Sequence, residues 1–575
     1  MTATPLTLSP AQLDAIVATT PDAATLDLLR MGQLSKRRLL LIAVRRAATD
    51  AAVSDAFDLL GAIDASAPGV VNQVLGRPLV NVWAIECLRT PAGGDAGGHL
   101  RFLDNIAAAA AIRAGLAFDL PLAAPHGAVH LPGLGTAHGL GAGEAVVRGG
   151  PNGATVVGVD ATVRIGGDGW SPVTTLRLGT DPSWAVELED QDPYRTCFGL
   201  PPVGLLDADA QRTVAATLAG AWDILTRDFP AYAGIIGATM RAVAPVVAAD
   251  DRSAVSAASQ LAYGMVAVCV PPDPATMALL LIHEQQHMTL GAVYDLVPLC
   301  VTNGEARHDA PWRLDPRPVP ALLQGTFAHL GVTDFWRVHR HSPGVDRAHA
   351  DFEFAYWREL TARAARTLLG SGELTAAGER FVGALATRVD DWAAEPVPAE
   401  VSGTVREMAD VNAVRWRLRN RRPAPDEVER LVGELRSGAH CPPVAAPAVA
   451  TAAPAPARHR GLSERIRQRL LAGGRIEGHL TDGDRAYVGG DFAAAAASYR
   501  TQISVDPTAD EPWVGLAAAL RRTGVEPAAT ALAARPELVR ALYLGGRVAS
   551  TAPDDVAAWL AGGLAPDRHG DGGSM

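Results

Sequence analysis

Residues Asp273 to Pro298, DPATMALLLIHEQQHMTLGAVYDLVP, are the stretch that decides the fold. Asp273 is a good N-cap residue and Pro274 suits the first position of a helix, while Pro298 lies near its end. The spacing therefore predicts one helix over this stretch. The apolar run LLLI just before the first histidine indicates that the helix is buried, so we expect it to form the centre of a helical core.

Within this helix the chain reads HEQQH, from His283 through Glu284 to His287. Positions i and i+4 of a helix face the same side, with Cβ atoms about 5–6 Å apart. Two imidazoles at this spacing can bind one metal ion from a rigid support. The sequence therefore predicts His283 and His287 as metal ligands, with Glu284 as a candidate catalytic residue beside them.

Two histidines do not complete a metal site. The stretch PALLQGTFAHLGVTDFWRV, beginning at Pro320, predicts a second buried helix with His329 on its apolar face. We predict His329 as the third ligand, and a core histidine that binds its own neighbours is the alternative. Glu305 is a rival third ligand, of the kind that thermolysin-type zinc peptidases use. It lies in the turn-rich stretch VTNGEARHDAP, which is a poor platform for a ligand.

Outside the motif, the pattern of apolar and turn-forming residues changes several times along the chain. Short β-rich runs separated by Gly, Pro and Asn favour hairpins, and helical patterns return from Asp207 to about Arg436. We predict an α+β fold that is mainly α. Its expected parts are an N-terminal helical region (1–120), a catalytic domain (121–440) with a β-hairpin or meander insertion near 128–188, a Pro/Ala linker (441–460), a small helical domain similar to a tetratricopeptide repeat (461–567) and a disordered tail (568–575).

Composition narrows the class of protein. The 62 acidic residues outnumber the 51 Lys and Arg, and the net charge of −11 argues against nucleic acid as the main partner. The five cysteines include no C-x-x-C pair, which excludes a cysteine-clustered metal module. The sequence shows neither a secretory signal pattern nor an apolar run long enough for a membrane span. We therefore expect a cytoplasmic protein that does not bind membranes.

Several of these segments together resemble a known family. The HExxH stretch and the following APWRLDPRPVPALLQGTFAHLGVTDFWR are similar to the HExxH-containing peptide-modification proteins found near ribosomal-peptide biosynthesis genes. Further similar segments are LEDQDPYR, HLPGLG and VRWRLRNRRP, so the resemblance spans roughly residues 128–423. Some members are fused behind radical-SAM domains. This chain has no CxxxCxxC motif and resembles the free-standing form.

The resemblance implies a dioxygenase that uses Fe(II), 2-oxoglutarate and O2 to hydroxylate the β-carbon of a side chain in a ribosomally made precursor peptide. Such an enzyme needs three protein ligands on one face of the iron. A guanidinium suits the distal carboxylate of 2-oxoglutarate, because its planar fork pairs with both oxygens. Arg313 and Arg317 are the candidates for that role, and ion pairs with neighbouring acids are the alternative. Glu284 would then orient a ligand or a water rather than act as a base.

Candidate substrate contacts come from two other segments. Asp192, Tyr194 and Arg195 match a family segment and are predicted to face the peptide, although a turn before a helix would use the same residues. The run RWRLRNRR from Arg415 to Arg422 is strongly basic. It suggests affinity for an acidic leader peptide more than for nucleic acid, and a solvated helix face is the alternative.

Two other functions fit the same residues. A zinc metallopeptidase acting on a peptide precursor would use Zn(II) and need Glu284 to deprotonate the metal-bound water. A non-catalytic peptide-binding protein would hold a structural metal and use the C-terminal helices for recognition. The HEQQH helix is common to all three hypotheses, which differ in the metal and in the role of Glu284.

Overall fold

The computed structural model describes residues 6–48, 51–89, 96–247, 255–301, 304–445, 448–449, 461–471, 476, 478–546 and 552–564. The predicted tail (568–575) and most of the predicted linker (441–460) lie outside the described residues. The chain divides into two compact units, unit 1 (Met1–Pro298) and unit 2 (Leu299–Met575). With 61% helix and 12% strand, it is a mainly helical α+β protein, which confirms the predicted fold class.

Unit 1 begins with helices, which are α1 (Pro10–Val17), α2 (Ala23–Ala47), α3 (Ala51–Ser66), α4 (Pro68–Leu75), α5 (Pro78–Arg89) and α6 (Ala96–Arg113). The alanines from Ala107 to Ala111 on α6 are fully buried. Their small side chains leave room for neighbours to approach closely, and α6 contacts α3, α4, α5 and the first strand. This helix is the centre of the first half of unit 1.

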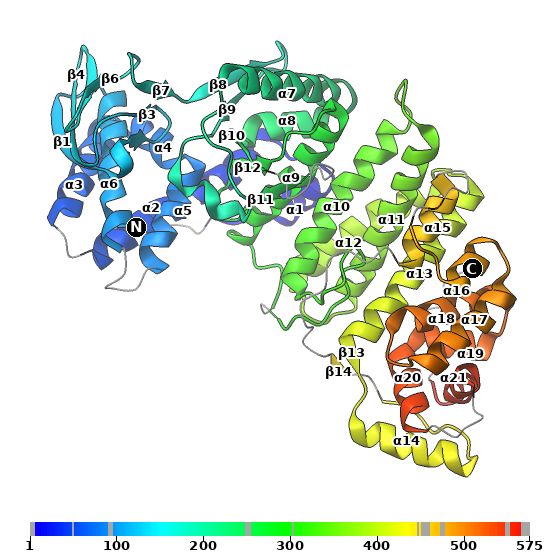
Figure 1. The fold of residues 1–575 in the computed structure, drawn as a ribbon. Coiled ribbons are helices and arrows are strands. Elements are labelled where there is room, and N and C mark those ends of the chain that lie inside the picture. Colours follow the sequence, from blue (N-terminus) through cyan, green and yellow to red (C-terminus); the bar gives the residue numbers. More distant parts are fainter. Residues whose placement is uncertain are drawn as a thin grey trace. The chain divides into compact units, whose positions relative to one another are not determined.

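A strand-rich segment follows, as predicted near 128–188. Its strands are β1 (Phe118–Ala124), β2 (Val129–Leu131), β3 (Gly135–Ala137), β4 (Gly143–Gly150), β5 (Gly153–Val157), β6 (Thr162–Arg164), β7 (Trp170–Pro172), β8 (Thr174–Leu178) and β9 (Trp184–Leu188). Two small antiparallel sheets form here, in the orders β1-β4-β5-β6 and β2-β3-β7. Figure 1 shows the first of them beside α6.

The third sheet of unit 1 has the order β11-β12-β10-β9-β8 and joins β9 to three later strands, β10 (Ala242–Pro245), β11 (Ser256–Ala258) and β12 (Met265–Val268). The parallel pairs are β9 with β10 and β10 with β12. The sequence predicted helices, with breaks, from Asp207 to about Arg436 and no strands there, so these later strands correct that expectation. The runs AVAP and MVAV are completely buried, and such short apolar runs carry no alternation that would distinguish a strand from a helix.

The helices of unit 1 that follow β9 are α7 (Ala208–Asp228), α8 (Pro230–Thr239) and α9 (Pro274–Tyr294). Helix α9 is the predicted HEQQH helix. Asp273 caps it as expected, because Oδ1 accepts hydrogen bonds from the backbone N–H groups of Ala275 and Thr276 at 2.9 and 3.0 Å. It packs against α2, α7 and α8 and against strands β11 and β12. This enclosure holds the two histidines on a rigid support.

In the described residues of unit 2 the secondary structure is helical apart from the short pair β13 (Arg421–Arg422) and β14 (Ala448–Val449). Its helices in the described residues are α10 (Val319–His339), α11 (Arg347–Leu369), α12 (Ala376–Asp391), α13 (Ala399–Asn420), α14 (Pro425–Ser437), α15 (Leu462–Leu471), α16 (Asp482–Val488), α17 (Phe492–Val505), α18 (Asp510–Thr523), α19 (Glu526–Ala534), α20 (Pro536–Gly545) and α21 (Pro553–Ala561). Helix α10 is the second helix predicted from the sequence. Figure 1 shows α10, α11 and α13 as long rods within this unit.

The C-terminal helices of unit 2 share a hydrophobic core with α13. Val405 and Leu418 of α13 are buried in the same cluster as Trp513 and Leu516 of α18 and Leu542 of α20. The helices after the Pro/Ala stretch are therefore packed onto the preceding part of unit 2. Among the described residues, no helix combines the length and the apolar character that crossing a membrane would require.

The cap of α9 gives the first prediction. Replacing Asp273 by Ala leaves the N–H groups of Ala275 and Thr276 without their acceptor, so the free energy of unfolding should fall by about 1 kcal/mol. Urea titration followed by tryptophan fluorescence measures it, since Trp184 and Trp222 are buried in unit 1. The Asp273→Asn variant keeps an acceptor and should retain the wild-type midpoint. An Ala variant with that same midpoint would contradict the assignment.

Candidate functional site

His283 and His287 lie one turn apart on α9 and face the same side. Their ring centroids are 4.8 Å apart and the ring planes meet at 84°. From Leu281 to Leu290 every residue except these two histidines is buried. The helix therefore hides its apolar and amide side chains and leaves two imidazoles partly accessible on a single face. The structure brings together these two predicted ligands as the sequence expected.

The separation of the rings fits a shared metal ion. Metal–nitrogen bonds of about 2.0–2.1 Å place each ring centroid roughly 3.2 Å from the ion, so two ligands about 90–110° apart should have centroids roughly 4.5–5.2 Å apart. The observed 4.8 Å falls within that range. The helix therefore presents the pair close to the arrangement that a metal requires. Imidazole nitrogen suits both iron and zinc, so this pair by itself does not select between them.

Glu284 is held in the interior of unit 1. Its side chain is 3% exposed, and Oε1 accepts a hydrogen bond of 2.6 Å from the hydroxyl of Ser256 on β11. The same Oε1 lies 4.0 Å from Nε2 of His283. The carboxyl group is thus anchored to the neighbouring strand while it lies beside the first imidazole. Ser256 was not a candidate from the sequence, because no motif marks a serine whose partner comes from a helix far along the chain.

The protonation of Glu284 follows from this burial. Burial raises the pKa of Glu284 above its usual range, although the charge of His287 and the hydrogen bond from Ser256 act in the opposite direction. Its second oxygen, Oε2, is buried and has no hydrogen-bond partner among the described residues. Unpartnered buried carboxylate oxygens are unfavourable. A cation held by the two histidines would offset this cost.

His329 lies on α10 in unit 2, where aromatic rings enclose it. Its ring stacks on Trp357 with centroids 4.4 Å apart and lies 4.3 Å from the ring of Trp312. Nδ1 donates a hydrogen bond of 2.7 Å to the carbonyl oxygen of Gly325, so in the neutral ring the lone pair resides on Nε2. This is the tautomer that a metal ligand bound through Nε2 requires. The role of His329 as third ligand stays a prediction.

The rival ligand Glu305 is exposed, in the loop that precedes α10. His308, a few residues later, binds the carboxylate of Glu373 through Nε2 at 2.9 Å. Among the described residues, no group of three or more His, Cys, Asp or Glu side chains is arranged to hold a metal ion. The described geometry therefore provides a two-histidine platform, and the third ligand stays open between His329 and Glu305.

The two arginines predicted for 2-oxoglutarate both pair with Asp315. Nε of Arg313 lies 2.8 Å from one carboxylate oxygen of Asp315, and Nε of Arg317 lies 3.3 Å from the other. Burial alone would raise the pKa of Asp315, but the hydrogen bond from Arg313 and the charges of both arginines outweigh it and lower this pKa. The arrangement is the ion pair that the sequence left as the alternative. A keto-acid carboxylate would have to replace Asp315.

The predicted substrate residues Asp192, Tyr194 and Arg195 form a turn. Oδ1 of Asp192 accepts a hydrogen bond of 2.9 Å from the N–H of Tyr194, and both residues are buried. The Tyr194 hydroxyl lies 3.0 Å from Nδ1 of His99. The guanidinium of Arg195 donates to the carbonyl oxygens of Asp192 and Val203, both at 2.8 Å. The structure thus gives these side chains a turn-stabilising role, and their contact with a peptide stays a prediction.

Comparison with known proteins adds no relative. No protein-family model matches the chain, and the search of curated proteins found no match. The resemblance to the HExxH peptide-modification family therefore rests on the quoted motifs. The features of the chain that bear on its function are the histidine pair, Glu284 and the groups around them.

The histidine pair predicts metal binding that a titration can measure. Replacing His283 or His287 by Ala removes one of the two ligands on α9, and the affinity for Co(II) should fall by at least about tenfold. Visible absorption of the bound Co(II) provides the readout. The His329→Ala variant should show a similar loss when His329 is the third ligand and no loss when Glu305 replaces it.

The control for this titration is His308→Ala. That substitution removes a histidine bound to Glu373, so the affinity for Co(II) should not change. A His283→Ala/His287→Ala double variant that binds Co(II) as tightly as the wild-type protein would refute the metal site.

Proposed function

We propose that this protein is an Fe(II)- and 2-oxoglutarate-dependent dioxygenase that hydroxylates the β-carbon of a side chain in a ribosomally made precursor peptide. The observation that carries the proposal is the pair of partly exposed imidazoles on an otherwise buried helix, at the ring separation that one metal ion needs. Iron bound there would supply the activation of O2 at the expense of 2-oxoglutarate, a chemistry that no amino-acid side chain provides.

The chain itself holds the metal ligands in place and orients the keto acid. The packing of α9 against α2, α7, α8, β11 and β12 fixes the directions of His283 and His287, because a helix held by these neighbours cannot rotate without disturbing them. Neutral imidazoles leave the positive charge of the metal intact, and a third donor from His329 or Glu305 would complete one face. The proposal assigns the distal carboxylate of 2-oxoglutarate to Arg313 or Arg317. Either guanidinium would exchange Asp315 for that carboxylate.

Glu284 acts in this proposal as a positioning residue. Its hydrogen bond from Ser256 ties it to β11, and its carboxylate lies beside Nε2 of His283. A carboxylate held there orients the imidazole or a water next to it. Hydroxylation needs no general base at this position, so the loss of its charge should weaken the reaction without abolishing it.

One observation favours the zinc peptidase as a second candidate. Burial raises the pKa of Glu284, and its carboxylate oxygen lies 4.0 Å from Nε2 of His283. A buried carboxylate with a raised pKa, close to a metal ligand, is suited to take a proton from a metal-bound water. In that case Glu284 would be indispensable. Removing the charge of Glu284 should therefore abolish the peptidase reaction but only weaken hydroxylation.

The C-terminal helices support a role in binding a peptide. We interpret α16, α17 and α18 as a repeat similar to a tetratricopeptide repeat, since consecutive helices of this segment contact each other. The ring of Tyr499 lies close to Gly483 and Gly515, where a larger residue would clash with it. Such helical pairs commonly present a concave surface to extended peptides. In this proposal the module assists the binding of the precursor peptide.

The keto-acid complex can be tested without a substrate peptide. Anaerobic protein reconstituted with Fe(II) should develop a weak visible charge-transfer band when 2-oxoglutarate is added, because the chelated keto acid accepts charge from the iron. The His283→Ala variant should lose this band. The Glu284→Gln variant should keep it. Tight zinc binding together with the absence of the band would contradict the dioxygenase.

Product mass distinguishes the two reactions. With a precursor peptide, Fe(II), 2-oxoglutarate and air, the product should gain one oxygen atom, whereas a peptidase loaded with zinc would release shorter peptides. The Glu284→Gln variant should reduce hydroxylation but abolish hydrolysis, since only hydrolysis depends on this carboxylate as a base. An unchanged substrate mass with either metal would contradict both the hydroxylase and the peptidase.

A further inference from the structure

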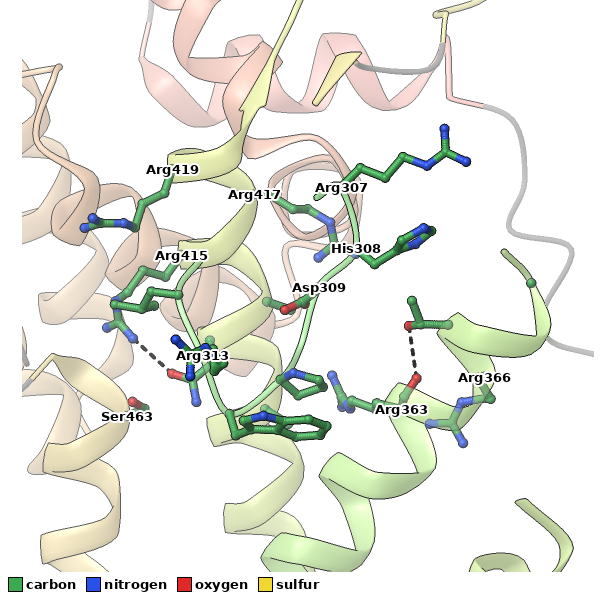
Figure 2. Close-up of a pocket in the computed structure, with 18 of the residues that line it drawn as sticks. Arg307, His308, Asp309, Arg313, Arg363, Arg366, Arg415, Arg417, Arg419 and Ser463 are labelled. Atoms are coloured by element: carbon green, nitrogen blue, oxygen red, sulfur yellow. Dashed lines mark hydrogen bonds between the residues drawn. The ribbon is translucent and has the colours of Figure 1, made fainter. Parts of the chain in front are cut away.

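Unit 2 contains an arginine-rich cavity of about 810 Å³. Its walls are the loop of residues 307–314, helices α11 and α13, the start of α15, and Glu511 at the start of α18. In Figure 2 this loop, which carries Asp309, passes between α11 with Arg363 and α13 with Arg415. Seven of the described residues that line the cavity are arginines, whereas Asp309 and Glu511 are its only described carboxylates. A cavity of this size suits a ligand rather than a trapped water.

Some of these arginines are neutralised by partners and form a rigid wall. Arg415 is 8% exposed and binds both carboxylate oxygens of Glu511 at 2.7 and 2.9 Å. Arg363 binds Glu359 and Asp410. These ion pairs lock α13 to α18 and α11 to α13. The basic run of the sequence is therefore not a solvated helix face, because its first arginine and Trp416 are buried in unit 2.

Three further arginines of the cavity bind no carboxylate directly in the described part of the chain, although Arg417 interacts with Asp309 through its charge. Arg366, Arg417 and Arg419 line the cavity, and within the described residues none of them makes a hydrogen bond or an ion pair. They come from α11 and α13, and Figure 2 shows Arg419 and Arg366 on opposite sides of the view with Arg417 between them, so they are spread along the cavity. An unpaired guanidinium keeps five N–H donors for an anion. The cavity thus holds an excess of positive charge on a wall fixed by the paired arginines.

Asp309 lies at the centre of this charge. The charged groups that act on it are Arg417 and Arg421 at the end of α13 and in β13, and Arg363 on α11. Burial raises the pKa of Asp309 to about 6, although these three arginines lower it. On its own segment, His308 is bound to Glu373. Protonation of Asp309 would increase the net positive charge of the cavity.

We propose that this cavity is a binding site for an acidic peptide segment with several spaced Asp or Glu side chains. Arginines pair with carboxylates through two parallel hydrogen bonds, and clusters of them recognise acidic motifs. The unpaired guanidinium groups lie on two helices, which matches carboxylates separated along a chain. Trp312 and Tyr356 add aromatic surface for the uncharged parts of such a segment. The inference does not depend on the metal site.

A peptide suits the cavity better than the other polyanions. A single phosphate needs donors that converge on one point, and here the free donors are spread over α11 and α13. Nucleic acid binding relies on extended positive surface, whereas the chain as a whole carries a net charge of −11. Both of these alternatives become outcomes of the experiment.

Fluorescence anisotropy with the full chain tests the proposal. The probe is a fluorescein-labelled peptide of alternating Glu and Gly, and the same peptide with Gln in place of Glu is the control ligand. The acidic peptide should bind, and its affinity should fall as NaCl rises from about 50 to about 300 mM. The Arg366→Gln/Arg417→Gln variant should bind at least about tenfold more weakly, because it loses charge-assisted hydrogen bonds.

The matched control is Arg430→Gln, which removes an exposed arginine of α14 outside the cavity. Its affinity for the acidic peptide should equal that of the wild-type protein. The proposal fails when the acidic peptide does not bind, when the double arginine variant binds it normally, or when free phosphate or a single-stranded oligonucleotide binds more tightly. None of these results bears on the metal site, which is tested by its own variants.

A substitution at Asp309 should have the opposite effect to the arginine substitutions and strengthen binding of the acidic peptide. Removing its charge with Asp309→Asn should tighten binding of the acidic peptide at about pH 7.5. Wild-type affinity should rise between about pH 7.5 and pH 5.5 as Asp309 gains a proton, while most glutamates of the probe stay ionised. The variant should lose this rise. An equal rise in the variant would show that Asp309 is not its source and would contradict this part of the proposal.

Discussion

The burial of α9 is the constraint on which the candidate site depends. A helix surrounded by α2, α7, α8 and two strands has one permitted rotation about its axis, because any other would expose apolar side chains and bury charged ones. That rotation leaves only His283 and His287 partly accessible between Leu281 and Leu290. The helical repeat then sets their ring separation. Both the metal ligands and their rigidity follow from one packing arrangement.

The same packing buries polar residues between the two histidines, which is unfavourable unless they form hydrogen bonds. Glu284 and Gln285 are buried, and each needs a partner inside the protein. Ser256 donates to Glu284, while the Gln285 amide binds the hydroxyl groups of Thr239 and Thr289 at 3.1 and 2.8 Å. The strand β11 therefore does more than complete a sheet, since it supplies the group that holds Glu284 beside His283. Within the described part of the chain, the other carboxylate oxygen of Glu284 has no hydrogen-bond partner.

Unit 2 uses charge in a different manner. Paired arginines such as Arg415 and Arg363 join its helices, and unpaired ones line a cavity between the same helices. Because guanidinium groups stay charged when partly buried, a wall of ion pairs can hold further arginines in place for a ligand. The histidine pair on α9 and the unpaired arginines of the cavity are separate sets of residues, whereas Arg313, a candidate for 2-oxoglutarate, also lines the cavity. In both sites, buried neighbouring groups fix the orientation of the polar side chains.

The amino-acid sequence by itself determined the features that depend on local spacing. The cap at Asp273, the helix that follows it and the common face of His283 and His287 are set by helix geometry over a few residues. Only the tertiary structure decided the partners of Glu284 and the pairing of Arg313 and Arg317 with Asp315. It also turned the basic run after Arg415 into the wall of a cavity. The partners of Glu284 and the cavity wall depend on which distant segments pack together, and short-range periodicity contains no information about that choice. The pairing of Arg313 and Arg317 with Asp315 is local, and the sequence offered it as one of two alternatives.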